Sequence, residues 1–325
     1  MVARAWERVE GKRPGISSVA RGIENRSGVE EMFVQNDADS LCLLLNRRVK
    51  TMRVIDFRAG PSYAKRLFVL KLAKKEGIEK VYTLVERDEV STWIKLGFEK
   101  EANIPGFYKR SDAFILGCVV DDAALSAQPA LNAADDDDDV VVAPEPSPAH
   151  DRMEKTLAKA KKEVKDLLDR PLPPTKLAVV KEAEVKKTID RNVKGGRALS
   201  AFEPFGRDVE RRWFQLTARN NFELVASTES QSCFGNAFLE LLTAPKSEHE
   251  RLATISALRT ICDKLLAEGV VSCFSMTPSD DIALGAAFVF NGFRRTGLLK
   301  NHIVVGGERK DAIVWSRKLA NPADE

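Results

Sequence analysis

Residues 222–319 constrain the fold more than any other stretch, because their hydrophobic pattern changes period in a fixed order. Residues 222–228 and 237–243 are β-type apolar runs. Leu and Ile then recur at helical spacing over about 250–268, and Gly269 stands where a helix C-cap glycine belongs. This part of the chain therefore predicts two strands followed by a long helix.

The second half of the stretch continues the alternation of strand and helix. A buried-type strand is predicted at 270–276. A helix is predicted to start at 277–280 and to end at 291–293. Two strands follow at 298–305 and 312–319, with a glycine turn at 306–307 between them. The complete order is strand, strand, loop, long helix, strand, helix, strand, strand. That order predicts an α/β module.

The same order resembles the GNAT superfamily of acyl-CoA-dependent N-acyltransferases. Gly292-Phe293, four residues after the aromatic Phe288, fits that superfamily's usual pattern at the end of the last helix. A series of single residues including Asn301, Gly306-Gly307 and Trp315 is similar to the end of the β-lysine N-acetyltransferase family. This narrower resemblance covers about the last hundred residues.

The N-terminal part repeats the pattern in shorter form. It is predicted as strand, turn, helix, strand, helix and strand, with Gly97-Phe98 closing its second helix. The run Glu101-Ala-Asn-Ile-Pro-Gly-Phe-Tyr108 is similar to the N-terminal region of the same β-lysine family. The Pro-Gly turn with its aromatics either covers a core edge or forms a loop over a ligand. In the second interpretation Tyr108 binds substrate.

The fold class that follows is α/β, with two GNAT-like (acyl-CoA N-acyltransferase) modules whose mixed central sheets are flanked by helices. A chain of 325 residues is long enough for two such domains. The predicted parts are an abbreviated module at 1–121, an acidic Pro/Ala-rich linker at 122–150, a connecting helix at 151–174, and the N-acetyltransferase module at 175–325. The five consecutive Asp residues at 135–139 favour a flexible linker over a metal cage, because their side chains diverge.

Composition narrows the class of protein. The 51 Lys and Arg residues nearly balance the 48 Asp and Glu residues, which argues against nucleic acid as a partner. The five cysteines are scattered without a CxxC pair, so we expect no metal site and a reducing compartment. We find neither a signal-type N-terminus nor a long apolar run, so we predict a cytoplasmic protein that does not bind membranes.

The GNAT resemblance implies acetyl-CoA as cofactor, with its pyrophosphate held by backbone N–H groups at the start of the long helix. The corresponding cofactor-binding residues are Lys246, Ser247, His249, Arg251 and Ala253. Both glycines of the family pattern are missing, and Glu248 and Glu250 place carboxylates where phosphate oxygens would come. In the first module the matching turn carries Pro61, which has no N–H to donate. Weak or absent acetyl-CoA binding is therefore predicted.

Amine attack on a thioester needs a base and an acid. Glu240 and Glu229 are the candidate bases, and Asn301 and His302 fall where the family has substrate-side Asn residues. The superfamily often uses a tyrosine as the acid, but Phe288 stands at that position.

Two functions stay open at this point. The chain is either an N-acetyltransferase acting on a small amine or amino acid, as the β-lysine resemblance implies, or a catalytically weakened GNAT-fold protein with a ligand-sensing, regulatory or protein-binding role. A purely structural, complex-forming protein is a third, weaker alternative.

Overall fold

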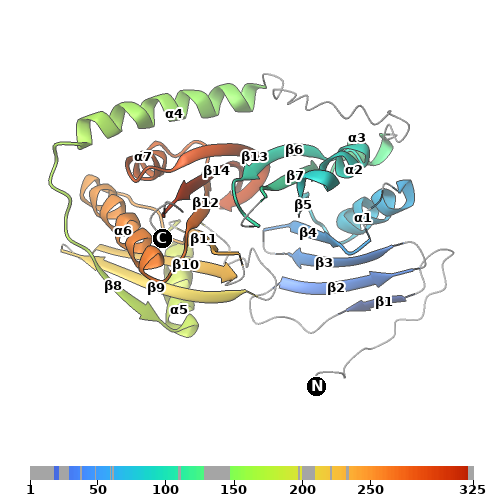
Figure 1. Cartoon of the computed structure of the whole chain (residues 1–325), viewed down its shortest axis with the longest axis horizontal. Helices are drawn as coiled ribbons and strands as arrows, with labels where there is room; N and C mark the ends of the chain where they lie inside the picture. The colour runs from blue at the N-terminus through green and yellow to red at the C-terminus, as the bar shows by residue number, and fades with distance from the viewer. Residues whose placement is uncertain are drawn as a thin grey trace. The chain divides into compact units, whose positions relative to one another are not determined.

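The computed structural model describes residues 18–21, 29–36, 39–47, 49–58, 60, 62–108, 111–127, 147–196, 198–199, 209–219, 222–231 and 234–320. The chain divides into two compact units. Unit 1 is Met1–Ala102 with Ala113–Val142, and unit 2 is Asn103–Asp112 with Ala143–Glu325. Each is a mixed α/β structure in which helices pack on a mixed sheet (Figure 1).

Unit 1 contains strands in the order β1–β2–β3–β4–β5–β7–β6. Their bounds are β1 Ser18–Arg21, β2 Val29–Gln35, β3 Ser40–Asn46, β4 Thr51–Asp56, β5 Lys80–Val85, β6 Glu99–Ile104 and β7 Ala113–Val119. The pair β4–β5 is parallel, and the helix α1 (Tyr63–Lys75) connects its strands. Ser62 caps this helix, because its side chain accepts from the backbone N of Lys65 at 3.3 Å.

The predicted linker begins with ordered structure. A short helix, α3 (Asp122–Ser126), follows β7 and is capped by Asp121. Arg66 of α1 holds it by donating to the carbonyl oxygens of Ala124 and Ala127, at 2.7 and 3.3 Å. The prediction of a linker from residue 122 onward is therefore wrong at its start, and positions 128–146 lie outside the described residues. The second helix of unit 1, α2 (Val90–Lys95), follows the 3-10 turn η1 (Arg87–Glu89).

Unit 2 repeats the strand order of unit 1. Its strands run β8–β9–β10–β11–β12–β14–β13, with bounds β8 Lys176–Val180, β9 Glu210–Ala218, β10 Phe222–Gln231, β11 Asn236–Leu241, β12 Ser272–Pro278, β13 Arg294–Val305 and β14 Glu308–Lys318. The pair β11–β12 is parallel, as is β4–β5 in unit 1, and α6 (Glu248–Ala267) connects its strands. The helix α7 (Ile282–Phe290) connects β12 to β13.

The core of unit 2 lies between the sheet and α6, α7 and α4. Apolar residues of α6 that recur at helical spacing meet Ala237, Leu239 and Leu241 of β11 there. Phe288 stacks on Trp315 with ring centroids 5.5 Å apart, and Nε1 of Trp315 donates to Oγ1 of Thr277 at 2.8 Å. Both rings are buried, as expected for core anchors.

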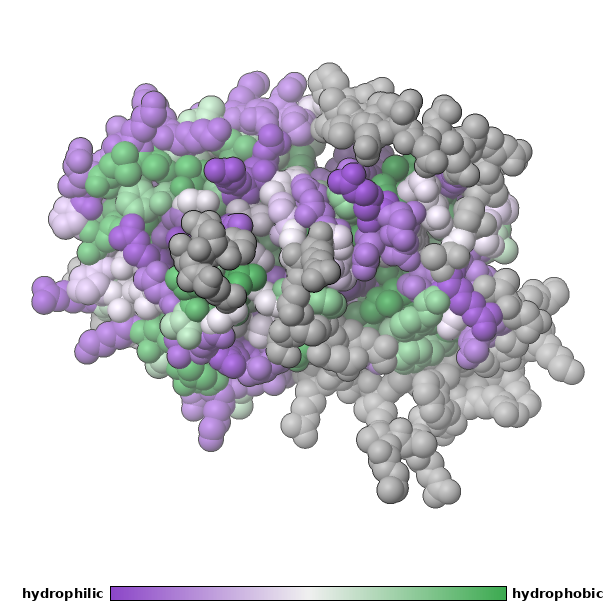
Figure 2. Space-filling model, in the orientation of Figure 1, coloured by the Kyte–Doolittle hydropathy of each residue, from purple (hydrophilic) through white to green (hydrophobic). Residues whose placement is uncertain are grey.

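The predicted connecting helix, α4 (Pro148–Leu167), belongs to unit 2 and packs on α7. Its buried residues are Met153, Leu157 and Ala160, and its outward side is hydrophilic (Figure 2). A Cβ atom added at Gly285 of α7 would lie 3.3 Å from Cβ of Ala160. Glycine at this position allows α4 to approach α7 closely.

Two segments differ from the sequence prediction. The strand β6 was not expected because it opens with three consecutive charged residues, and α5 (Glu182–Lys194) was not expected in the second module. Residues 103–112 belong to unit 2 although the predicted module boundary is at 121. They are held there by a hydrogen bond from Nδ2 of Asn236 to the Phe107 carbonyl and by ring contacts of Phe107 with Phe234 and Phe274.

Candidate functional site

The parallel strands β11 and β12 separate at their carboxyl ends. Their pairing runs from Asn236 and Ser272 to Leu239 and Ser275 and then stops. Beyond Ser275, β12 continues to Pro278 beside β14. The chain leaving β11 at this end enters α6, so the divergence of the strands and the start of the long helix lie at the same end of the sheet.

The start of α6 is capped by its own side chains. Oγ of Ser247 accepts from the backbone N of Glu250 at 3.2 Å, and Oε2 of Glu250 accepts from the backbone N of Lys246 at 2.7 Å. The N–H of Glu250 belongs to the first turn of α6, where an anion would need such donors. The Glu250 carboxylate also engages the N–H of Lys246, which lies just before the cap.

The other predicted cofactor-binding residues differ in their contacts and in their burial. Nζ of Lys246 donates to the Gly195 carbonyl at 2.9 Å, and Nε2 of His249 lies 3.0 Å from the Arg219 carbonyl oxygen. Arg251 is exposed one turn into the helix. The side chain of Ala253 is fully buried and packs in the core cluster, and its role in cofactor binding stays a prediction.

Sequence reasoning missed a cation at this helix start. Nη1 of Arg170 lies 2.9 Å from Oε1 of Glu248. Arg170 follows α4 and is 78 positions away in the chain, so no local pattern connects the two residues. The Arg170 guanidinium therefore lies at the start of α6, but it is paired there with Glu248, one of the two carboxylates at this helix start.

The two candidate bases come together around one arginine. Nη2 of Arg211 lies 3.0 Å from Oε2 of Glu240, and its Nε lies 3.4 Å from Oε1 of Glu229. Glu240 and Glu229 are buried, with 8% and 3% of their surface exposed. The structure therefore places both predicted bases in one cluster, which sequence reasoning had treated as separate alternatives.

Sheet register explains this cluster. Arg211 is opposite Glu229 across β9 and β10, and Ser227 is opposite Glu240 across β10 and β11. Directly paired residues share one face of a sheet, so all four lie on the face away from the α6 core. Oγ of Ser227 donates to Oε2 of Glu240 at 3.1 Å. Arg211 also lies 4.2 Å over the Trp213 ring, and neither Arg211 nor Ser227 was singled out from the sequence.

Tyr108 belongs to an aromatic cluster on the same face. Its ring lies 4.8 Å from Phe107 and 5.3 Å from Phe234 between centroids. Phe107 also contacts Phe274, which packs on Phe238 at 5.1 Å. Because Phe238 is opposite Glu229 in the sheet, the aromatic cluster adjoins the carboxylates. Tyr108 is half-buried, and its role in substrate binding stays a prediction.

Asn301 and His302 lie in an irregular part of β13, where its register with β14 shifts between Leu299 and Ile303. Asn301 has a φ of 49°, in the left-handed region that Asn tolerates better than most residues. Its backbone N donates to Oδ1 of Asp311 at 2.8 Å. Asn301 thus has a local role in the bulge, and His302 is buried. Substrate binding by either residue stays a prediction.

The start of α7 also carries a perturbed carboxyl. Oδ1 of Asp281 accepts from the backbone N of Leu284 at 2.9 Å and caps the helix. Burial raises the pKa of Asp281 above its usual value, while the hydrogen bond from Leu284 acts in the opposite direction. The neighbouring Asp280 adds to the upward shift, and Arg251 opposes it. The Asp281 carboxyl therefore ionises at a higher pH than an exposed Asp does.

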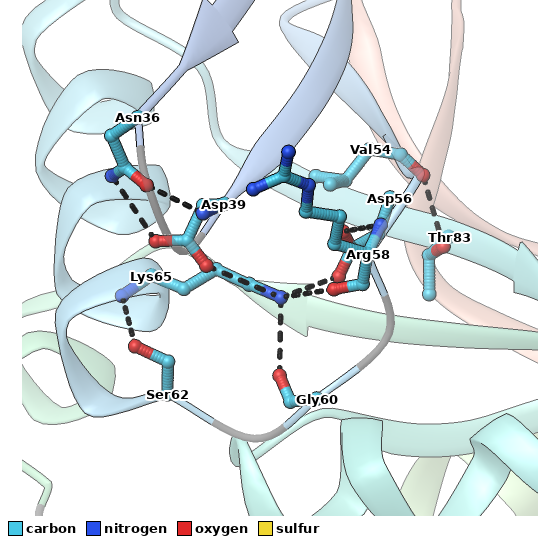
Figure 3. Close-up of polar contacts among 9 residues, drawn as sticks. All are labelled: Asn36, Asp39, Val54, Asp56, Arg58, Gly60, Ser62, Lys65 and Thr83. Atoms are coloured by element: carbon cyan, nitrogen blue, oxygen red, sulfur yellow. Dashed lines mark hydrogen bonds and ion pairs between the residues drawn. The ribbon is translucent and has the colours of Figure 1, made fainter. Parts of the chain in front are cut away.

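In unit 1, the loop from β4 into α1 corresponds to the loop from β11 into α6. A lysine side chain fills this loop (Figure 3). Nζ of Lys65 donates to Oδ2 of Asp56 at 2.6 Å and to the carbonyl oxygens of Arg58 and Gly60 at 3.1 Å each. Its Nζ also lies 3.5 Å from Oδ1 of Asp39. The loop turns carbonyl oxygens toward this ammonium, whereas a phosphate cradle must turn N–H groups toward an anion.

Two kinds of feature are absent from the described residues. No group of three or more His, Cys, Asp or Glu side chains in these ranges could hold a metal ion. Within the same ranges, no helix is both long and apolar enough to cross a membrane.

Comparison with known proteins gave structural matches alone. No family model matches the chain, and no curated protein matches it. The ribosomal-protein-S18-alanine N-acetyltransferase of Escherichia coli is 18% identical, with a TM-score of 0.35 over 45% of this chain and 95% of that chain. The spermidine N-acetyltransferase of Vibrio cholerae, solved with CoA and spermine, is 12% identical, with a TM-score of 0.35 over 45% of this chain and 95% of that one.

Proposed function

We propose that unit 2 is a GNAT-type N-acyltransferase module that transfers acetyl from acetyl-CoA to a small amine or amino acid. The observation that carries this proposal is the divergence of β11 and β12 at the end where α6 begins. It supplies the strand, loop and long-helix arrangement that the GNAT resemblance implies for acyl-CoA. The acceptor class within the proposal is an amino acid of the β-lysine type.

The buried carboxylates supply the chemistry that an amine substrate needs. An ammonium group must lose a proton before its nitrogen can attack the thioester carbon, and a carboxylate can accept that proton. Glu240 is the proposed base, with Arg211 and Ser227 fixing its orientation. Glu229 shares the same arginine and adds negative charge that favours a cationic amine. The adjoining rings of Phe238 and Tyr108 offer an apolar wall, and the face of a ring attracts a cation.

The second candidate function is a catalytically weakened GNAT-fold protein that senses a ligand or binds a protein. The capped start of α6 favours it specifically, because the Glu250 carboxylate folds back onto the Lys246 N–H and places negative charge where a phosphate would bind. Glu248 adds a second carboxylate at the same helix start. Under this alternative, acetyl-CoA binds weakly and transfer is slow or absent.

We further propose that unit 1 is an abbreviated module of the same type that holds no acyl-CoA. Its strand order and its parallel β4–β5 pair repeat those of unit 2. The Lys65 ammonium, with a side chain 2% exposed, occupies the loop that would face the pyrophosphate. Unit 1 therefore has a structural role in this proposal.

Acetyl transfer can be tested by measuring release of CoA thiol from acetyl-CoA in the presence of amines. Spermidine, β-lysine, lysine and a small aromatic amine form a suitable panel. The proposal expects amine-dependent thiol release that saturates with at least one of them. Thiol release no faster than the protein-free control, in a protein that still binds acetyl-CoA, would instead support the weakened alternative.

A further inference from the structure

One buried hydroxyl of unit 2 lacks a hydrogen-bond partner. Ser275 lies on β12, and its side chain is fully buried. Its Oγ forms no hydrogen bond within the part of the chain that the structure describes. A buried polar group without a partner has lost its hydration and gained nothing in exchange, which costs stability. A hydroxyl that is kept at this cost is a candidate for contact with a ligand.

Ser275 stands at the level where β11 and β12 diverge. It pairs with Leu239 as the last of the parallel pairs, and with Trp315 of β14 on its other side. Leu239 and Trp315 both belong to the core cluster of α6, so the Ser275 side chain points to that face of the sheet. The indole N–H of Trp315 is already used, because Nε1 donates to Oγ1 of Thr277 at 2.8 Å.

Unit 1 has a hydroxyl at the corresponding position, and there it is satisfied. The last parallel pair between β4 and β5 is Val54 with Thr83, as Leu239 with Ser275 is between β11 and β12. Thr83 is also buried, but its Oγ1 donates to the Val54 carbonyl at 2.9 Å (Figure 3). The unit whose loop is filled by Lys65 therefore bonds this hydroxyl within the sheet, whereas unit 2 leaves it unused.

We propose that the Ser275 hydroxyl donates to the carbonyl oxygen of the acyl group, and that Ser275 is a catalytic residue of acetyl transfer. This inference rests on the proposed function, which puts acyl-CoA where the two strands diverge. The thioester oxygen is an acceptor, and it completes the unused donor of Ser275. Glu240 directly follows Leu239, so it lies beside the same level of the sheet but on the opposite face. The base and the hydroxyl then approach one acyl group from the two faces of the sheet.

The reaction needs such a donor when negative charge develops on the carbonyl oxygen. One proton of the ammonium group passes to Glu240, and the freed nitrogen forms a bond to the thioester carbon. The carbonyl electron pair moves to oxygen, and the Ser275 hydroxyl donates to the resulting oxyanion. When the intermediate collapses, the carbonyl re-forms, the carbon–sulfur bond breaks, and a second proton from the nitrogen goes to the leaving thiolate. Ser275 keeps its own proton throughout.

Ser275→Ala separates this role from a role in folding. Because the hydroxyl has no partner, its removal should leave the urea midpoint of unfolding no lower than that of wild type. In the thiol-release assay, kcat should fall by about a hundredfold, the loss that follows removal of one oxyanion donor. Thr83→Val is the matched control in unit 1. It should lower the urea midpoint, since it removes a formed hydrogen bond, and should leave kcat unchanged.

Binding gives a second readout that needs no turnover. CoA lacks the acyl carbonyl, so wild type should bind acetyl-CoA about fivefold more tightly than CoA in calorimetry, and Ser275→Ala should lose this preference. An unchanged preference together with an unchanged kcat in Ser275→Ala, or a lowered urea midpoint, would overturn the role of Ser275 while leaving acyl-CoA use intact. Absence of both binding and transfer in wild type would overturn it together with the proposed function.

Discussion

Nη2 of Arg211 lies 3.0 Å from Oε2 of Glu240, and the same guanidinium faces Glu229 through its Nε. Arg211 therefore fixes the positions of two buried carboxylates on neighbouring strands. Glu240 also accepts a hydrogen bond from Ser227, so its orientation is set from two sides. A base held in one orientation loses little entropy when it meets a substrate proton.

Replacement of Glu240 by Gln should lower kcat/KM for acetyl transfer by about a hundredfold, because the amide keeps the shape but cannot accept the substrate proton. The dissociation constant for acetyl-CoA should stay within about twofold, since Glu240 lies before the α6 loop. Thiol-release kinetics and calorimetry measure the two quantities. Glu223→Gln, on the same sheet and bonded to Gln215, is the matched control. Equal loss in both variants would remove the specific role of Glu240.

The double variant Glu248→Gln/Glu250→Gly should bind acetyl-CoA about tenfold more tightly than wild type, a change on the order of 1.4 kcal/mol. It removes two carboxylates from the α6 start and frees the Lys246 N–H, which Glu250 now engages. Calorimetry at two salt concentrations measures the change, and a salt-dependent gain is expected because the removed repulsion is electrostatic.

Glu184→Gln provides the control for this pair, because it removes a carboxylate from the first turn of α5. It should leave the acetyl-CoA affinity unchanged. A double variant that binds no better than wild type would show that the carboxylates do not limit binding.

Phe288→Ala should lower the free energy of unfolding by about 3–5 kcal/mol, because the ring is fully buried between Trp315 and Phe293. Chemical denaturation monitored by tryptophan fluorescence measures it. Phe290→Ala, at a half-buried position on the same helix, should cost less. A fully stable Phe288→Ala protein with altered ligand binding would contradict the assignment of Phe288 to the core.

Asp281→Asn should stabilise the protein at neutral pH but not in acid. Burial raises the folded-state pKa of Asp281 above its usual value, so its ionisation costs stability as the pH rises through the folded pKa. Asn keeps the cap on α7 without the charge. Urea unfolding between pH 3.5 and 7 should therefore show a difference from wild type that grows with pH. A difference that is constant across this range would contradict the linkage.

Several elements of unit 2 followed directly from the sequence. The helical spacing of Leu252, Leu258 and Leu265 and the glycine after it predicted α6 nearly to its bounds, because burial of one face dictates that spacing. The apolar runs that contain Leu298 and Val314, separated by the turn at Gly306, predicted the last two strands. The observed starts of α6 and α7 differ from the predicted ones by a few residues, because the capping side chains of Ser247 and Asp281 set them.

The parts that sequence missed depend on contacts between distant residues. Arg211 was not singled out, because its partners lie on two other strands and follow from the sheet register alone. The attachment of residues 103–112 to unit 2 depends on Asn236 and Phe274, far along the chain. The three charged residues that open β6 hid it, since the local pattern does not reveal a strand whose partners lie elsewhere.

The most direct test of the central claim is the stoichiometry of acetyl-CoA binding to the intact chain, measured by isothermal titration. We predict one acetyl-CoA per chain with a dissociation constant above about 10 µM, because the capped α6 start weakens the site in unit 2 and Lys65 fills the loop of unit 1. Absence of saturable heat up to about 1 mM acetyl-CoA, or binding of two molecules per chain, would contradict the account.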